Sequence, residues 1–239
     1  MQIRLLDLSF SSPAENLACD EALLDELEAG SGPPTLRFWE SSTPFVALGY
    51  ANSVATEVNR AACEQLGIPI LRRCSGGGTV VQGPGCLNYN LTLPIASETA
   101  GITETNCFVM SRHRDAMTRL LGKETRIQGH TDLTLDGVKF SGNAQRRKKN
   151  ALVFHGCFLL EFDLALIERV LLHPTREPDY RAGRPHSRFI TNLHVSTDAI
   201  KEALTATWEA WASAAPPNRN RVDALVKERY ANPAWNSKF

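Results

Sequence analysis

The sequence lacks paired cysteines, long apolar runs and an excess of charge of one sign. None of the six cysteines forms a CxxC pair, which excludes the usual spacing of a zinc site or a dithiol redox motif, so no bound structural metal is expected. No apolar run approaches the roughly 18 residues that suggest a membrane span. The N-terminal apolar stretch is short and interrupted by Asp7, unlike a signal peptide. We therefore expect a cytoplasmic protein with reduced thiols and no membrane contact.

The charges balance, with 26 basic and 26 acidic residues. A net charge of zero provides no general attraction to nucleic acid, so any anion must be bound by a local cluster. The 239 residues, 43% of them hydrophobic, suffice for a substantial core. Because Pro216-Pro217 is the only candidate boundary and little follows it, we expect one domain over 1–239. The residues from about 197 to 239 are expected to form its helical C-terminal extension.

Hydrophobic periodicity predicts strands and helices without strict alternation. Helices are expected over 12–28, 56–66, 104–121, 163–172, 197–214 and 219–230. Strands are expected in MQIRLLDLSF, TLRFWES, PFVALGY, IPILRR, CLNYNLTLPI and ALVFHGCFLLEF, with a hairpin turning at Asp136-Gly137. This mixture indicates an α+β fold with a mixed β-sheet flanked by helices.

The segment RRCSGGGTVVQGPGCLNYNL, residues 72–91, combines two arginines with a run of three glycines. Glycines at 76–78 allow positive φ angles and close approach of a ligand to the backbone. Successive N–H groups in such a loop can form a concavity that binds an anion. One of Arg72 and Arg73 is then available to an anion while the other pairs elsewhere, although a plain β-turn with surface arginines explains the composition equally well.

Three later segments add polar groups. Lys139 follows the Asp136-Gly137 turn, and Asn143 and Gln145 lie just beyond it as possible amide contacts. His155 stands in an apolar strand, where a hydrogen-bonded core histidine is more common than a catalytic base. The fourth segment, HSRFITNL at 186–193, is uninformative alone.

Taken together, these segments resemble the lipoate–protein ligase family, within the biotin/lipoate ligase and octanoyltransferase superfamily. The matching residues occur in the family's order over about the first 195 residues: NLACDEALL, PFVALGYANS, RRxSGGG, GxLNY, KxSGNAQ, HG and RFITNL. The resemblance implies a catalytic domain similar to that of biotin ligases, without a large C-terminal accessory domain.

The resemblance also implies an activity: ATP and Mg²⁺ activate lipoate as lipoyl-AMP, and the lipoyl group then passes to a lysine of an acceptor domain. Lys139 matches the catalytic lysine that contacts the acyl-phosphate and carbonyl oxygens. Positions matched to the adenylate site are Arg73, Ser75, Gly76, Gly77, Gly78, Thr79, Val80, Val81, Asn88, Lys139, Ser141, Gly142, Asn143 and Ala144. Walls of the acyl tunnel are expected from Leu71, Val81, Leu87 and Tyr89.

Two alternatives stay open: an octanoyltransferase that uses a preformed acyl donor, and a homologue that binds lipoate or octanoate without catalysis. The superfamily's transferases carry a cysteine nucleophile at one of two positions. Here RIQGHTDL contains no cysteine and Thr175 stands at the other position, which disfavours the transferase. Cys74, Cys86 and Cys157 are expected to be packing residues.

Two departures from the family pattern concern completeness of the site. Gln82 replaces a histidine found in many relatives, so any polar role there is altered. Larger ligases carry an accessory domain that is not expected here, which leaves three alternatives for adenylation. The C-terminal helices are sufficient, a separate accessory subunit completes the reaction, or the protein uses a preformed acyl-adenylate. RRKK at 146–149 is a candidate contact for an acidic acceptor domain, or a solvated hairpin tip.

Overall fold

The computed structural model describes residues 2–174 and 176–239, so Thr175 lies outside the described residues. The strands are β1 (Arg4–Asp7), β2 (Thr35–Trp39), β3 (Phe45–Leu48), β4 (Ile70–Arg72), β5 (Val80–Gln82), β6 (Cys86–Pro94), β7 (Arg126–Gln128), β8 (Asp132–Leu135), β9 (Val138–Arg147), β10 (Ala151–Leu159) and β11 (Ala212–Ser213). The α-helices are α1 (Pro13–Glu28), α2 (Val54–Glu57), α3 (Arg60–Leu66), α4 (Ile102–Leu121), α5 (Leu164–Val170), α6 (His186–Phe189), α7 (Thr197–Trp208), α8 (Arg219–Leu225) and α9 (Pro233–Asn236). Short helical turns cover Ser97–Thr99, Asp179–Arg181 and Val226–Tyr230.

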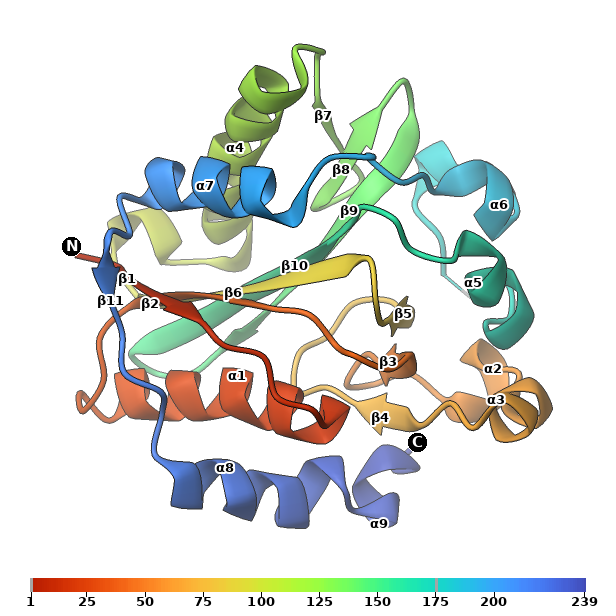
Figure 1. The fold of residues 1–239 in the computed structure, drawn as a ribbon, viewed down its shortest axis with the longest axis horizontal. Coiled ribbons are helices and arrows are strands. Elements are labelled where there is room, and N and C mark those ends of the chain that lie inside the picture. The colour runs from red at the N-terminus through yellow and green to blue at the C-terminus, as the bar shows by residue number, and fades with distance from the viewer. Residues whose placement is uncertain (1, 175) are drawn as a thin grey trace.

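A large sheet runs through the molecule in the order β11-β1-β2-β6-β10-β9-β8-β7. β1 pairs in parallel with β2 and β11, and the remaining pairs are antiparallel. Helices cover both faces: α4 and α7 lie on one side, and α1 with α8 lies on the other (Figure 1). The expected α+β class with a mixed sheet is confirmed.

Alternation along β10 divides its side chains between these two layers. Phe154 and Phe158 belong to the core beneath α4 and α7, whereas Val153 packs with Leu24 of α1. His155 and Cys157 share the α1 side of the sheet, because they alternate with the same period. The strand thus presents polar groups on one face while the opposite face builds the main core.

A small second sheet, β4-β3-β5, holds the glycine-rich segment. β3 pairs in parallel with β4 and antiparallel with β5, so the chain between β4 and β5 has to turn within residues 73–79. In Figure 1 this sheet lies beside the end of β10, close to the C-terminus of the chain. The three glycines of the sequence motif therefore sit at the junction of the two sheets.

The predicted elements are present, and several of their bounds need correction. The expected 56–66 helix is interrupted at Val58, which bridges to Leu171, and restarts after the capping residue Asn59. The expected 197–214 helix ends at Trp208 because Glu209 adopts a left-handed conformation with φ 51°. The short helices α6 and α9 were not predicted, since neither is long enough to show a period.

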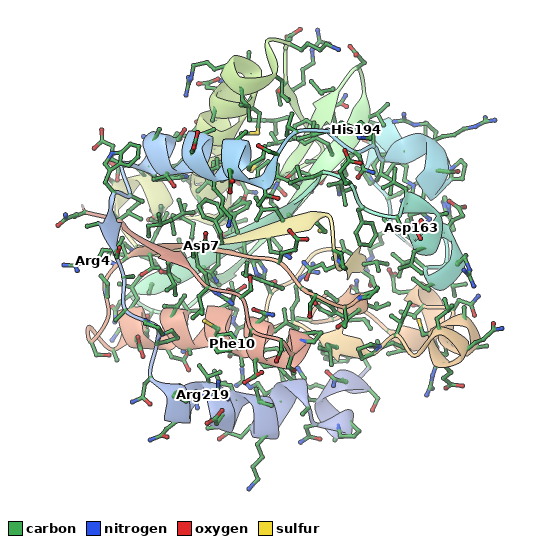
Figure 2. All side chains as sticks on the ribbon, in the orientation of Figure 1. Arg4, Asp7, Phe10, Asp163, His194 and Arg219 are labelled. Carbon is green, nitrogen blue, oxygen red and sulfur yellow. The ribbon has the colours of Figure 1, made fainter. Side chains whose placement is uncertain are left out.

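Charged capping residues and buried ion pairs help to fix the packing. Asp163, at the start of α5 (Figure 2), accepts hydrogen bonds from the amides of Ala165 and Leu166. Arg37 of β2 is fully buried and pairs with Asp20 of α1 at 2.6 Å. Its guanidinium also donates to the carbonyls of Leu8 and Asn16.

None of the helices in the described ranges is long and apolar enough to cross a membrane.

We predict that Arg37→Ala lowers the free energy of unfolding by about 3–5 kcal/mol, because it leaves the buried carboxylate of Asp20 without its cation. Urea denaturation measures this change. Arg126→Ala is the control, since Arg126 forms an exposed pair with Glu124 and its loss should be undetectable. Equal effects of the two substitutions would contradict the assignment of the Arg37 pair as structural.

Candidate active site

A cavity of about 860 Å³ opens where the two sheets meet. Its walls come from β5, β6, β9 and β10, from residues 128–132 and 176–181, and from α1, α5 and α6. This volume lies in the range of small-molecule and cofactor sites. Most of the residues matched to the adenylate site line it: Arg73, Gly77, Gly78, Thr79, Val80, Val81, Asn88, Lys139, Ser141, Gly142, Asn143 and Ala144.

Arg73 binds the carbonyl groups of the glycine loop, residues 75–79. Its side chain donates to the Gly76 carbonyl at 2.6 Å and to the Gly78 carbonyl at 2.8 Å. Further bonds reach the Ser75 hydroxyl and the Ala47 carbonyl. Burial lowers the pKa of Arg73 to about 10, so the guanidinium remains charged at neutral pH. Most of its donors are engaged by the loop itself, and its direct contribution to anion binding stays a prediction.

The remaining glycine carbonyl is also occupied, by Asn52, which donates to Gly77 at 3.2 Å and to the Thr79 hydroxyl at 3.0 Å. In a trans peptide the N–H points away from the carbonyl of the preceding residue. The amides of Gly77 and Gly78 consequently point away from Arg73 and Asn52, and neither donates a hydrogen bond within the described ranges. Gly77 has φ 85°, a conformation that other residues rarely adopt. The loop therefore offers free donors beside the cavity.

Ser75 and Gly76 do not line this cavity. Ser75 is fully buried, and its hydroxyl lies within hydrogen-bonding distance of His155 Nε2. Because Arg73 Nε donates to the same hydroxyl oxygen at 3.0 Å, the Ser75 proton is free to point toward His155. His155 Nδ1 lies 3.8 Å from a carboxylate oxygen of Asp20. The histidine is thus hydrogen-bonded, as expected, but it also lines the cavity with 13% of its side chain exposed.

Lys139 projects from β9 into the cavity and pairs with Asp132 of β8 at 2.8 Å. A Cβ added at Gly142 would lie 2.8 Å from Lys139 Nζ, so glycine at this position leaves room for the ammonium group. The RFITNL segment runs alongside, with the Thr191 amide donating to the Lys139 carbonyl and the Phe189 ring centroid 5.9 Å from Nζ. These contacts explain a motif that sequence alone left uninformative.

Asp132 and Tyr180 are site residues that the sequence did not reveal. The Tyr180 hydroxyl donates to the second carboxylate oxygen of Asp132 at 2.7 Å. Burial, and then the negative charge of Asp132, raises the pKa of Tyr180, which keeps the phenol protonated. Tyr180 comes from a segment without regular pattern, and 48 residues separate it from its partner, so no sequence signal pointed to it.

The amides of Asn143 and Gln145, proposed above as ligand contacts, are engaged within the protein. Asn143 accepts from the Tyr89 hydroxyl at 2.6 Å and donates to the Thr131 carbonyl, which holds residues 129–131 against β9. Gln145 donates to the Ile102 carbonyl and to Asn106. A Cβ at Gly156 would collide with Asn143 Oδ1 at 1.9 Å, which accounts for the glycine of the HG motif.

The three motif cysteines differ in their environments. Cys74 and Cys86 are buried, and burial raises the pKa of the Cys74 thiol to about 12. Cys157 lines the cavity, and a hydrogen bond from Cys86 lowers its pKa, helped by the charge of Lys139 and a bond from the Gly142 amide. The packing role expected for Cys157 therefore accounts for only part of its environment.

Five residues that line the cavity each have a buried polar side-chain atom with no hydrogen-bond partner in the described structure: Gln82 Oε1, Asn88 Oδ1, Gln128 Oε1, Ser141 Oγ and Arg181 Nη2. Buried polar atoms normally find partners, so these atoms mark places where a ligand or water belongs. Of the expected tunnel walls, Val81 and Tyr89 line the cavity. Leu71 and Leu87 pack instead in the hydrophobic core, which corrects that expectation.

Comparison with known proteins agrees with this site. Residues 12–209 match the family model of the lipoyl protein ligase A/B catalytic domain. The chain is 26% identical to the octanoyltransferase LipM of Geobacillus kaustophilus, with 98% of each chain covered. It is 32% identical to a protein of Aeropyrum pernix provisionally named lipoate-protein ligase A, over 88% of this chain and 75% of the relative.

Solved structures are similar over nearly the full length. A lipoate-protein ligase A bound with ATP superposes with a TM-score of 0.83 at 25% identity, covering 99% of both chains. A Thermoplasma acidophilum protein with bound lipoic acid gives a TM-score of 0.82 at 25% identity, covering 99% of this chain and 100% of the other. The fold of the chain is therefore the fold of these proteins.

We predict that His155→Ala loosens the glycine loop, because it removes the hydrogen-bond partner of Ser75. Loss of about 1 kcal/mol of local stability corresponds to roughly fivefold faster amide hydrogen exchange in residues 74–79. His194→Ala is the matched control, since this exposed histidine contacts Glu161 far from the loop. Unchanged exchange in His155→Ala would show that the histidine does not hold the loop.

Proposed function

Because the chain belongs to the lipoyl protein ligase A/B catalytic-domain family, we propose that it attaches a lipoyl or octanoyl group to a lysine of an acceptor protein. The observation that supports this function best is that one cavity is lined both by a lysine and by glycines of a loop with unpaired backbone amides. Gly77 and Gly78, whose amides donate no hydrogen bond in the described part of the chain, line the same cavity as Lys139. Such preorganised donors stabilise negative charge that develops on a reacting acyl group.

The route that we propose first passes through an acyl-adenylate. A carboxylate oxygen of lipoate attacks the α-phosphorus of ATP and pyrophosphate departs; the acceptor amine then attacks the acyl carbonyl, and AMP leaves with loss of one proton from the amine. In this scheme Lys139 contacts the carbonyl and phosphate oxygens, and the glycine amides bind the phosphate. Asp132 neutralises Lys139 until the substrate oxygens replace it.

The cavity also carries oxygen ligands suited to Mg²⁺. Gln128 lies directly opposite Asp132 across the β7–β8 pair, and its Oε1 is buried without a partner in the described part of the chain. Mg²⁺ bound with ATP usually takes one or two carboxylates together with waters and phosphate oxygens. When bound, it would neutralise phosphate charge, and Asp132 and Gln128 would hold it. No group of three potential metal-binding side chains occurs among the described residues.

Contacts with the acceptor domain are expected near the tip of the β9–β10 hairpin, although only part of the RRKK segment is available. Arg147 donates to the Thr99 and Ala100 carbonyls, and Lys148 pairs with Asp25. Arg146 and Lys149 remain exposed. A bipartite ligase of T. acidophilum has a similar catalytic fold, with a TM-score of 0.81 at 25% identity, covering 99% of this chain and 96% of the other. An accessory subunit thus remains part of the proposal.

We expect the purified protein, with ATP, Mg²⁺ and lipoate, to form lipoyl-AMP and to lipoylate an acceptor domain. Lys139→Ala should reduce the rate by about 10²–10³-fold because a charge that stabilises the transition state is lost. Lys123→Ala, at an exposed position in the loop between α4 and β7, is the control and should leave the rate unchanged. Mass spectrometry of nucleotide and acceptor gives both readouts.

Failure of wild-type protein to make lipoyl-AMP, with transfer restored by synthetic lipoyl-AMP, would support the accessory-subunit version. Tight lipoate binding without formation of lipoyl-AMP or lipoylated acceptor, even after addition of cell extract, would instead show that the protein binds lipoate without catalysis. Normal turnover by Lys139→Ala would show that the lysine has no catalytic role.

A second candidate function, ATP-independent octanoyl transfer, is favoured by one observation. Cys157 is a thiol in the cavity whose pKa is lowered by a hydrogen bond from Cys86 and by Lys139. The thiolate would attack an acyl thioester, releasing the carrier thiol, and the acceptor amine would then take the acyl group from sulfur. The LipM relatives are named octanoyltransferases, yet neither position at which the superfamily places its nucleophile carries a cysteine here.

The two candidates differ in their requirement for ATP. Transfer from octanoyl-carrier protein without ATP, abolished by Cys157→Ser and retained by the exposed-site control Cys107→Ser, would establish the transferase. Because we favour the adenylate route, we expect no ATP-independent transfer and nearly normal ligase activity in Cys157→Ser.

A further inference from the structure

The four residues 72–75 divide their contacts between two sides of the chain. Arg73 contacts carbonyl groups of the glycine loop, and Ser75, the first residue of that loop, contacts His155, as described above. Arg72 and Cys74 contact the opposite side, where the last ten residues of the chain, 230–239, lie against the small sheet. We call these ten residues the C-terminal strap. In Figure 1 the C-terminus ends beside β4, the strand that leads into the glycine loop, and α9 contacts β4.

Arg72 joins the strap to the loop that follows β3. Its buried guanidinium donates to the strap carbonyls of Trp235 at 3.1 Å and Asn236 at 3.0 Å. The same guanidinium donates to the carbonyls of Gly49, Tyr50 and Asn52, at 3.1, 2.9 and 2.6 Å. One cation thus binds five carbonyl groups from two segments of chain.

The backbone of Arg72 and the side chain of Cys74 add contacts to the strap. The Arg72 amide donates to Asn236 Oδ1 at 2.8 Å, and the Trp235 indole N–H donates to the Arg72 carbonyl at 2.8 Å. The Cys74 thiol hydrogen-bonds to Tyr230, whose hydroxyl also donates to Glu21 of α1 at 2.6 Å. The strap is consequently anchored to β4 and to α1.

The loop after β3 in turn positions the glycine loop. Asn52 donates to the Gly77 carbonyl, and the Tyr50 amide donates to the Ser75 carbonyl at 2.8 Å. A Cβ at Gly49 would lie 2.1 Å from the Gly77 carbonyl oxygen, so the two backbones pack without space between them. Movement of residues 49–52 would therefore move Gly77, which lines the cavity.

From this chain of contacts we propose that the C-terminal strap, acting through Arg72, positions the glycine loop for the nucleotide phosphates. Arg72 and Trp235 are positioning residues, since neither lines the cavity. The effect on nucleotide binding rests on the proposed ligase function, whereas the effect on the glycine loop does not. Loosening the strap should weaken ATP binding and leave the acyl end of the cavity unchanged.

The test compares Trp235→Ala with Trp211→Ala, a tryptophan that is 70% exposed before β11 and distant from the strap contacts. Hydrogen exchange is measured by mass spectrometry on peptides covering 49–52 and 74–79, with α4 as an internal reference. Trp235→Ala should accelerate exchange in both peptides by about tenfold, the effect of losing one to two hydrogen bonds. Trp211→Ala should leave them unchanged. Faster exchange confined to 225–239 would overturn the proposal.

Kinetics provide a readout that general destabilisation would not produce. We expect KM for ATP to rise about tenfold in Trp235→Ala, corresponding to the same local loss, while KM for lipoate stays within about twofold. Equal increases in both constants would also overturn the proposal. If the Trp235→Ala protein does not fold, Asn236→Ala replaces it in the same experiments. This substitution removes the acceptor of the Arg72 amide with less loss of packing. If wild-type protein shows no ATP-dependent activity, adenylation by this chain alone fails, and the exchange experiment still decides the role of the strap.

Discussion

The site depends on the binding of glycine-loop carbonyls by two side chains, the buried Arg73 and the half-buried Asn52. Arg73 holds the carbonyls of Gly76 and Gly78, and Asn52 holds that of Gly77. Peptide geometry then directs the neighbouring amides away from these donors. An arginine that met the ligand directly would leave the loop free to collapse into an ordinary turn. Here the cation instead fixes the backbone, and the backbone supplies neutral donors that need no counter-charge when the cavity is empty.

The opposite wall follows a different principle, because its charge is neutralised in advance. Lys139 is paired with Asp132, and Asp132 is held in turn by Tyr180. A partly buried ammonium without a partner would be unfavourable, and Asp132 compensates its positive charge in the cavity. Gly142 provides the space for its end group. In the proposed reaction, the neutral donors of the loop and the charge of Lys139 act together on a negatively charged acyl intermediate.

Sequence patterns predicted the sheet class and the main helices, because hydrophobic period is a local property, and most of the residues matched to the family's adenylate site do line the cavity. They did not predict Asp132 with Tyr180 or the contacts of Arg72 with the strap, since both join segments far apart in the chain. They also treated Asn143 and Gln145 as ligand contacts, although both satisfy backbone groups within the protein. A motif identifies which residue types are needed at a site; only the fold shows which of their polar atoms are already engaged.

The most direct test of the account is calorimetric binding of a non-hydrolysable acyl-adenylate analogue, such as lipoyl-sulfamoyl adenosine. In the proposed site the glycine amides and Lys139 together bind the acyl-phosphate group of such a molecule. We predict tight 1:1 binding by the wild-type protein that weakens by about 100-fold in Lys139→Ala, the usual effect of removing a charged partner from a buried contact. Equal affinity of the two proteins for the analogue would contradict the account.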